Sequence, residues 1–401
     1  MAFSPGQIGS LEIKNRLVRS ATFESRAENG KATDELVEFY STLAKGGVGL
    51  IITGHCAVHP EGYMTPRMTR ISHDCFIPGL RKISNVVHGV GTGCKILLQL
   101  NHPGRQTLPG TDREPIAPSA VYDSLYKRIP REMTAGEIEE MVDCFAEGIG
   151  RAREAGFDGA QIHAAHGWLL GSFLSPHTNR RQDGYGGSTE KRTCIIREIM
   201  KKGRKKVGDD FPILIKINSD DCFPGGINLD EALRIVKEFI TLGFSAVEVS
   251  GGVRESLARP EEELGWKPVP IPEARVGIAR EDQEAYFWSG AKTIKKIVNL
   301  PVILVGGIRS LDKIEEILEE GSVDFCAMAR PFIREPNLPE KFLRRETQKA
   351  ACISCNACLP FDGGPVRCRA DEKNRAKGLS KAEVMLIQGL RETFKKENHN
   401  P

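Results

Sequence analysis

The sequence predicts an α/β fold of the (β/α)8 (TIM) barrel class with a short cysteine-rich C-terminal extension. Short runs rich in β-branched residues alternate with amphipathic helical stretches, which is typical of a parallel sheet with crossover helices. Eight such runs can be counted, and eight strands with their crossovers favour closure into a barrel. The length of 401 residues suits one barrel of roughly 250 to 350 residues with an appendage.

An open, doubly wound sheet is the alternative fold. It would carry a Gly-x-Gly-x-x-Gly fingerprint for a dinucleotide after its first strand, and the sequence has none there. The barrel is therefore favoured, and Thr134 with Glu137 matches a capping box at the start of its third helix. Strands are expected at residues 17–20, 49–53, 95–100, 159–163, 213–217, 246–249, 302–305 and 325–327, and helices at 34–45, 77–88, 136–155, 191–207, 229–242, 290–298 and 312–319.

Two insertions interrupt the alternation, at residues 101–131 after the third strand and 251–284 after the sixth. Both are expected at the C-terminal ends of the strands, where barrel enzymes place their chemistry. The proline- and glutamate-rich part of the second insertion, 259–275, has little apolar periodicity. A lid and a solvated loop are equally compatible with it.

The end of the chain differs in composition from the barrel. Val384, Ile387 and Leu390 recur at helical spacing in a mostly charged stretch, which is more typical of a docking or oligomer helix than of a site. A homo-oligomer is thus among the assemblies that the sequence allows. We expect three parts: a barrel at 1–345 that binds a cofactor, a four-cysteine segment at 346–370, called the cysteine segment from here on, and a charged helical tail at 371–401.

Charge and composition exclude several classes of function. The net charge is only +3, so there is no electrostatic case for a nucleic-acid or anionic-membrane partner. No apolar run approaches the roughly 18 residues needed to span a bilayer, and residues 1–10 do not read as a signal peptide. We therefore expect a cytoplasmic protein, in whose reducing environment the eleven cysteines are not disulfides.

The strongest local signal is the end of the fourth strand, where His163 and His166 are followed by a glycine and Trp168. Two imidazoles just past a strand end can together hold one oxygen atom of a bound molecule. Alternatively, one histidine is a ligand and the other is a structural group. The spacing of the two histidines does not separate these interpretations.

A longer pattern follows in the next loop. It contains Phe-Leu-Ser-Pro-His-Thr-Asn at 173–179, then Arg181, Asp183, Tyr185-Gly-Gly-Ser188 and Arg192. This run resembles the flavin-dependent old yellow enzyme family, in its NADH:flavin oxidoreductase branch. The resemblance extends over residues 3–368 and implies FMN as the cofactor.

Glycines and an arginine mark the ends of the last two strands. Gly306 and Gly307 let a phosphate approach backbone N–H groups, and Arg330, after Ala329, can bind it with two N–H groups. The residues thus predict a phosphate site, which such barrels carry with or without flavin. By the resemblance, these four residues hold the FMN phosphate, Gln99 bonds the flavin pyrimidine, and Ala21, Thr22, Gly54 and His55 meet the ring near N5. From the residues alone, Gln99 reads equally well as a polar strand end.

Lys216, in the fifth strand, departs from the family, most of whose members have arginine there. A buried cation beside flavin N1 and O2 would stabilise negative charge on the reduced ring, and lysine can do so as a point charge without the planar grip of arginine. The resemblance assigns Lys216 this role. A rival from another class is a flavin-free lyase or aldolase that uses Lys216 as a Schiff-base nucleophile.

Reduction by flavin needs a polarised acceptor and a proton. His163 and His166 are the expected donors to the carbonyl oxygen of the acceptor. Members of the family commonly have a tyrosine acid two residues after the second histidine, but this chain has Trp168, whose indole N–H is not an acid at neutral pH. Tyr185, Tyr286 and water are left as proton sources.

Four cysteines crowd together with the spacing C-x2-C-x2-C-x9-C, at Cys352, Cys355, Cys358 and Cys368. Three closely spaced thiolates can bind one face of a cluster, with the fourth closing it. The spacing resembles the 4Fe-4S motif of the branch that includes 2,4-dienoyl-CoA reductase and trimethylamine dehydrogenase, with a shorter last interval. A four-thiolate zinc site is the alternative.

The sequence thus predicts an FMN-dependent oxidoreductase that reduces an activated C=C bond of an enone, enoate or enoyl-CoA. Its rivals within flavin chemistry are an oxidative enzyme of the amine dehydrogenase or demethylase type, which the missing tyrosine favours, and an electron-transfer subunit. Larger relatives continue into an FAD- and NAD-binding domain, for which the sequence leaves no room. Electrons are therefore expected from NAD(P)H directly or from a separate donor protein.

Overall fold

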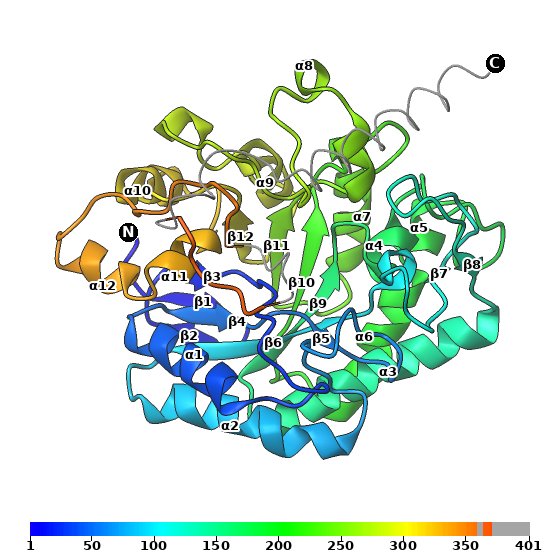
Figure 1. Cartoon of the computed structure of the whole chain (residues 1–401), viewed down its shortest axis with the longest axis horizontal. Helices are drawn as coiled ribbons and strands as arrows, with labels where there is room; N and C mark the ends of the chain where they lie inside the picture. The colour runs from blue at the N-terminus through cyan, green and yellow to red at the C-terminus, as the bar shows by residue number, and fades with distance from the viewer. Residues whose placement is uncertain (359–363, 371–401) are drawn as a thin grey trace.

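Eight parallel strands close into a barrel in the computed structural model, which describes residues 1–358 and 364–370 (Figure 1). The strands follow chain order around the barrel, and the last pairs with the first, so the sheet is closed. The predicted barrel is confirmed and the open sheet is excluded. The strands are β3 (Leu17–Arg19), β4 (Leu50–Ile52), β6 (Lys95–Asn101), β9 (Gly159–Ala164), β10 (Ile213–Asn218), β11 (Ala246–Ser250), β12 (Val302–Val305) and β13 (Phe325–Met328).

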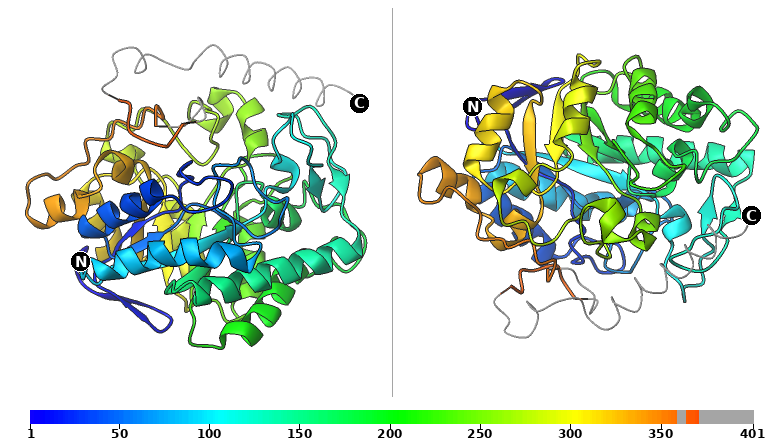
Figure 2. Two further views of the ribbon diagram at one scale, coloured as in Figure 1. Left: turned by 60° about the horizontal axis from the view of Figure 1, so that its bottom comes forward. Right: turned by 90° about the horizontal axis from the view of Figure 1, so that it is seen from above.

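Helices surround the barrel and cover the outer face of its strands (Figure 2). In the described part of the chain, no helix combines the length and apolarity that crossing a membrane requires. The long helices lie where the sequence predicts them: α1 (Asp34–Lys45), α2 (Ile77–Gly89), α3 (Ala135–Glu154), α6 (Cys194–Val207), α7 (Leu229–Phe239), α9 (Trp288–Lys295) and α10 (Leu311–Glu319). The short helix α5 (Thr189–Arg192) overlaps the start of the helix predicted at 191–207. Short helices that were not predicted are α4 (Leu169–Leu174), α8 (Glu261–Leu264), α11 (Arg330–Arg334) and α12 (Leu338–Leu343).

Capping residues explain where several helices begin. The capping box at α3 is confirmed: the Thr134 backbone N–H donates to Glu137 at 2.8 Å, and the Glu137 N–H donates back to Oγ1 of Thr134 at 3.3 Å. The single helix predicted at 191–207 is instead divided between α5 and α6 at Thr193. The Thr193 hydroxyl donates to the Glu190 carbonyl oxygen at 2.8 Å, a local bond that bends helices.

The hydrophobic core has two layers. An inner layer fills the barrel and includes Val18, Leu97 and Phe325, and a larger outer layer lies between the strands and the helices. The hairpin of β1 (Gly6–Ile8) and β2 (Leu11–Ile13) adds Ile8 and Ile13 to the inner layer. The left panel of Figure 2 shows this hairpin at one end of the barrel and the insertion at 251–284 at the other. With the hairpin closing that end, the mouth at the C-terminal ends of the strands is left for a site.

The cysteine segment is tied to the barrel mouth. The Ala350 N–H donates to the carbonyl oxygen of Arg309 at 2.8 Å, and the Arg309 side chain donates to the carbonyl oxygen of Ala350 at 3.1 Å. Farther along, the Val366 N–H donates to the Glu24 carbonyl oxygen at 2.9 Å. These bonds hold the segment beside the ends of β12 and β13. The tail predicted at 371–401, with its apolar stripe, lies outside the described residues.

Candidate active site

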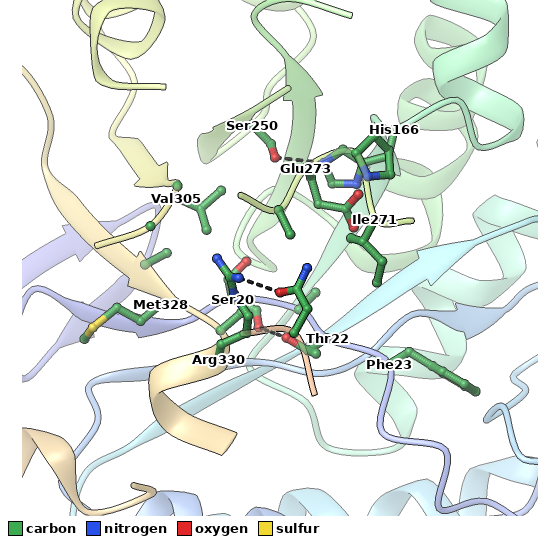
Figure 3. A pocket seen from close by; sticks show the side chains of 18 of the residues that line it. Ser20, Thr22, Phe23, His166, Ser250, Ile271, Glu273, Val305, Met328 and Arg330 are labelled. Carbon is green, nitrogen blue, oxygen red and sulfur yellow. Dashed lines mark hydrogen bonds between the residues drawn. The ribbon is translucent and has the colours of Figure 1, made fainter. Parts of the chain in front are cut away.

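A cavity of about 260 Å³ opens at the barrel mouth, with side chains from the end of every strand in its wall (Figure 3). Residues 270–274 of the second insertion also line it, so this stretch covers the mouth rather than extending into solvent. The predicted site residues that line the cavity are Ala21, Thr22, His55, Gln99, His163, His166, Trp168, Lys216, Tyr286, Gly306, Gly307, Ala329, Arg330 and Cys358.

The floor of the cavity is a continuous network of buried polar side chains, none more than 5% exposed. Gln99 Nε2 donates to Gln161 Oε1 and Gln161 Nε2 donates to Glu248 Oε2, both at 2.7 Å. The other oxygen of Glu248 accepts from the Ser20 hydroxyl at 2.6 Å and from Lys216 Nζ at 3.1 Å. A carboxylate only accepts hydrogen bonds, so Glu248 sets the direction of both amides. Gln99 is thereby oriented toward the cavity with a carbonyl oxygen and one N–H to spare.

The ion pair of Lys216 with Glu248 bears on two roles that the sequence allows for this lysine: a cation beside the flavin and a Schiff-base nucleophile. Its ammonium is 5% exposed and lies against the fully buried carboxylate of Glu248. Its Nζ donates to Glu248 and to the Ser20 hydroxyl within the floor, whereas a Schiff-base nucleophile needs a free amine that faces the substrate. The lyase reading is therefore disfavoured by geometry, and a cation at the cavity floor is what the structure provides.

His163 and His166 lie together at the roof of the cavity, with ring centroids 5.1 Å apart. His166 Nε2 lies 2.8 Å from the Ser250 hydroxyl, the bond drawn dashed in Figure 3, and His163 Nδ1 accepts from the Ala165 N–H at 3.4 Å. Burial lowers the pKa of both imidazoles well below their ordinary value, with Lys216 adding to the effect. Both rings are therefore neutral, and His163 is left with its Nε2–H to donate into the cavity.

Trp168 fills the position of the usual tyrosine. Its ring lies 5.0 Å from that of His55 and 6.1 Å from that of His163, and the Arg254 guanidinium lies 6.0 Å from its centroid. Burial, followed by the charge of Arg254, lowers the pKa of His55 to about 4. His55 is held by Asn101, whose amide lies 2.8 Å from Nδ1. None of these groups is an acid near neutral pH.

The two candidate tyrosines have other partners. The Tyr185 hydroxyl donates to Glu198 at 3.0 Å, and Tyr185 is not part of the cavity wall. The Tyr286 hydroxyl donates to the backbone oxygen of Glu273 at 2.9 Å. The Glu273 side chain itself points into the cavity (Figure 3), and burial raises its pKa against the opposing charges of Lys216, Arg254 and Arg330. A carboxyl group thus faces the space where sequence reasoning sought a tyrosine.

Unpartnered donors gather at the end of the cavity near β12 and β13. Gly306 and Gly307 have φ of 137° and 75°, and a Cβ on Gly307 would lie 2.6 Å from the Tyr286 ring, so glycine is required there. Two buried nitrogen atoms in this wall, Arg309 Nε and Asn356 Nδ2, have no hydrogen-bond partner in the part of the chain that the structure describes. Cationic and amide donors at one end, with amide, hydroxyl and ammonium groups on the floor, fit the phosphate and the pyrimidine of FMN.

The four cysteines line a second, much smaller cavity of about 20 Å³. Arg334 donates to Cys368 Sγ at 3.3 Å, and burial raises the pKa of the Cys358 thiol to about 11. Within residues 1–358 and 364–370, no three His, Cys, Asp or Glu side chains are arranged to hold a single metal ion. The donor set fits an iron–sulfur cluster in chemistry, and the shared cavity brings all four thiols together.

Two of the predicted residues lie outside the cavity wall for structural reasons. Gly54 donates its N–H to Glu24 and Tyr40, and its lack of a Cβ makes room for the Glu24 carboxylate, so it is not part of the cavity wall. The residues of the loop pattern around Tyr185 make hydrogen bonds and ion pairs that hold the loop in place. Arg181 donates to the carbonyl oxygens of Pro118 and Met133 at 2.9 and 2.6 Å, and Arg192 pairs with Glu231.

Comparison with known proteins identifies the family. Residues 2–348 match the NADH:flavin oxidoreductase / NADH oxidase family. The chain belongs to this family. The resemblance to old yellow enzymes is thereby confirmed, and membership implies FMN with NAD(P)H as electron donor.

Relatives of this chain differ in length. It is 39% identical over 363 residues to NADH oxidase of Thermoanaerobacter brockii, which covers 88% of this chain and 52% of that protein. It is 36% identical to NADPH dehydrogenase of Geobacillus sp. (strain WCH70), with 84% and 92% covered. The structure of a 2-naphthoyl-CoA reductase with 2-naphthoyl-CoA matches with a TM-score of 0.82 at 26% identity, covering 92% and 56%. The chain thus spans about half the length of the first relative.

Sequence reasoning missed several residues that the structure brings to the site. Gln161 and Glu248 carried a usable signal, because each is a polar residue with an apolar residue on either side inside a barrel strand. Arg254, Glu273 and Asn356 carried none. Arg254 begins a short 3-10 helix in the second insertion, and Glu273 and Asn356 lie in irregular segments, where no periodicity predicts the direction of a side chain.

Proposed function

We propose that this protein is an FMN-dependent reductase of an activated C=C bond, in an enone, an enoate or an enoyl-CoA thioester. The observation that carries the proposal is the pair of neutral histidines, His163 and His166, above a floor that offers amide and ammonium donors. Neutral imidazole N–H groups can hold a carbonyl oxygen and stabilise negative charge that develops on it.

When bound, reduced FMN supplies a hydride to the electron-poor carbon of the substrate. Gly306, Gly307, Ala329 and Arg330 would hold its phosphate, and Gln99 and Lys216 its pyrimidine side. Ala21, Thr22 and His55 line the same cavity near the position expected for the ring centre. The residues of the second insertion at 270–274 exclude water from above, which strengthens the hydrogen bonds made by the histidines.

We further propose that Glu273 supplies the proton to the neighbouring carbon. Tyr185 is outside the cavity wall, Tyr286 is engaged with a backbone oxygen, and Trp168 is not an acid. Glu273 would become a carboxylate on proton transfer and regain its proton from solvent. Water delivered without Glu273 is the alternative source.

The cysteine segment is proposed to hold a 4Fe-4S cluster. Its support is the cavity shared by Cys352, Cys355, Cys358 and Cys368 and the three closely spaced thiols. Such a cluster would accept electrons from a separate donor protein, while NAD(P)H could reduce the FMN directly. A cytoplasmic, reducing compartment suits eleven free cysteines. A zinc ion in place of the cluster is the alternative.

Anaerobically purified protein tests these proposals. We expect flavin absorbance, with iron and acid-labile sulfide in near-equal amounts. Reduced protein should be reoxidised by at least one of 2-cyclohexenone, crotonate or crotonyl-CoA. Failure to retain FMN from excess cofactor would contradict flavin chemistry altogether. One zinc ion per chain without sulfide would show a zinc site in place of the cluster. Reduction of the flavin by a secondary amine, with no turnover of enones, would show an oxidative enzyme.

The role of Glu273 is tested by Glu273→Gln beside Tyr185→Phe as a matched control outside the cavity wall. Loss of a general acid should slow substrate-driven reoxidation by about 100-fold or more, while reduction of the FMN is unchanged. Tyr185→Phe should leave both half-reactions intact. An unaltered reoxidation rate and pH profile in Glu273→Gln would assign the proton to water.

A further inference from the structure

The large cavity and the cysteine cavity share a wall. Arg330, Ile333, Asn356 and Cys358 line both of them. Arg330 follows β13, whereas Asn356 belongs to the cysteine segment, between the second and third cysteines. A residue of the cysteine segment therefore faces the end of the cavity where a phosphate is expected.

Arg330 sets the direction of the Asn356 amide. Its Nη1 donates to Asn356 Oδ1 at 2.5 Å, a bond drawn dashed from Arg330 in Figure 3, and also to the carbonyl oxygen of Arg275 at 2.8 Å. A guanidinium has donors only, so the amide oxygen must face it. The amide nitrogen therefore points away from Arg330, which removes the usual ambiguity between the two ends of an asparagine.

That amide nitrogen is buried, and it has no hydrogen-bond partner among residues 1–358 and 364–370. Asn356 is only 9% exposed, and its backbone adopts φ of 60°, which asparagine tolerates better than most residues. Buried polar atoms in folded proteins are almost always hydrogen-bonded, so an orphaned donor beside a cavity points to an absent acceptor.

The charges around this position favour an anion as that acceptor. Arg309 Nε, in the same wall, is a second buried donor without a partner. Among the described residues, no carboxylate lies within ion-pair distance of either Arg309 or Arg330. Glu273 lines the cavity as well, and burial raises the pKa of its carboxyl group although the charges of Lys216, Arg254 and Arg330 lower it. The wall thus combines two unpartnered buried donors, Arg309 Nε and Asn356 Nδ2, with two guanidinium groups that have no carboxylate partner among the described residues.

We propose that Asn356 Nδ2 donates to the phosphate of FMN, so that the cysteine segment completes the cofactor site. The inference rests on FMN as the cofactor and is independent of the substrate. It makes the binding of the flavin and the folding of the cysteine segment favour each other, because the segment presents the amide only when it lies against Arg330. Loss of the segment's structure should then release FMN even though every barrel residue is intact.

The test compares FMN with riboflavin, which has the same ring and no phosphate. Full-length protein is stripped of flavin anaerobically, and the affinity for each flavin is measured by quenching of flavin fluorescence, with iron and sulfide assayed in the same samples. Asn356→Asp keeps the size and the tolerance for positive φ but replaces the donor with an acceptor. We expect it to weaken FMN binding by about 10-fold to 100-fold and to leave riboflavin binding unchanged.

Asn29→Asp is the matched control, since Asn29 also has positive φ, 49°, but is exposed and outside the cavity wall. It should alter neither affinity. Asn356→Gly accepts the same backbone conformation and removes the amide without adding a carboxylate. It should therefore lose part of the preference for FMN over riboflavin, but less than Asn356→Asp, whose carboxylate also repels the phosphate. Equal losses of FMN and riboflavin in Asn356→Asp would show a purely structural residue, and no loss of FMN would place the amide away from the phosphate. Either result overturns the proposal while leaving flavin binding by the barrel intact.

Discussion

Two regions of the cavity differ in how their buried polar atoms are partnered: the floor, and the end near β12 and β13 where a phosphate is expected, called the phosphate end below. On the floor, Gln161, Glu248 and Lys216 come from neighbouring strands, and their buried polar atoms are all partnered without any ligand. At the phosphate end, Arg309 and Asn356 come from loops and keep unpartnered buried donors. Strands thus carry groups that must be in place before a cofactor arrives, whereas the loops carry groups that are completed by it. The floor should therefore govern folding, and the phosphate end should govern retention of the cofactor.

The largest expected effect comes from removing a charge on the floor. Glu248→Gln leaves the Lys216 ammonium buried without its counter-charge, and breaking a buried pair in this way costs about 3–5 kcal/mol. Urea denaturation of the apoprotein would measure the loss. The double variant Glu248→Gln with Lys216→Met should recover much of it, because no charge is then left uncompensated.

A surface ion pair serves as the reference for that measurement. Lys202 and Asp143 lie 2.6 Å apart but are 43% and 59% exposed, so Asp143→Asn should change the stability far less than Glu248→Gln. Equal costs for the two single variants would mean that the floor is no more important to folding than the surface.

The next largest expected effect is a loss of folding stability at acid pH, through the buried His55. Folded His55 stays neutral down to about pH 4, whereas the unfolded chain binds this proton near its ordinary pKa of 6.5. The unfolded state therefore binds more protons between these values, and stability falls as the pH falls through this window, by about 3 kcal/mol from His55 alone. Denaturation of the wild type and of His55→Gln at several pH values should show a shallower loss in the variant. Parallel curves would contradict a neutral, buried His55.

A smaller effect is expected at the phosphate end. Gly307→Ala places a methyl group 2.6 Å from Tyr286 on a backbone with φ of 75°, and should cost about 1–3 kcal/mol while reducing FMN retention. Gly321 has a similar φ of 70° with nothing within 4 Å, so Gly321→Ala isolates the backbone strain. Thermal melting with and without FMN checks both. The comparison of floor and phosphate end fails if Gly307→Ala destabilises the apoprotein but leaves cofactor binding unchanged.

The fold was predictable from the periodicity of apolar residues. The part of the site that lies at the ends of the strands was predictable from its position in the barrel. Apolar runs marked all eight barrel strands, and residues at their ends, such as His163 and Gly307, followed from where such barrels place their ligands. The pairing of Arg330 with Asn356 was not predictable, because it joins two irregular segments. The loop at 179–192 teaches a different lesson. It identified the family most specifically, yet Arg181 and Tyr185 hold the loop in place away from the cavity.

Trp168 has one more consequence. The chain has three tryptophans, and Trp168 is the one in the cavity wall, beside His55 and His163. An indole in that position is a built-in optical probe: occupation of the cavity by an absorbing ring will quench its emission by energy transfer. The residue that removes an acid from the reaction therefore lets ligand entry be followed without any label, in the native protein and in real time.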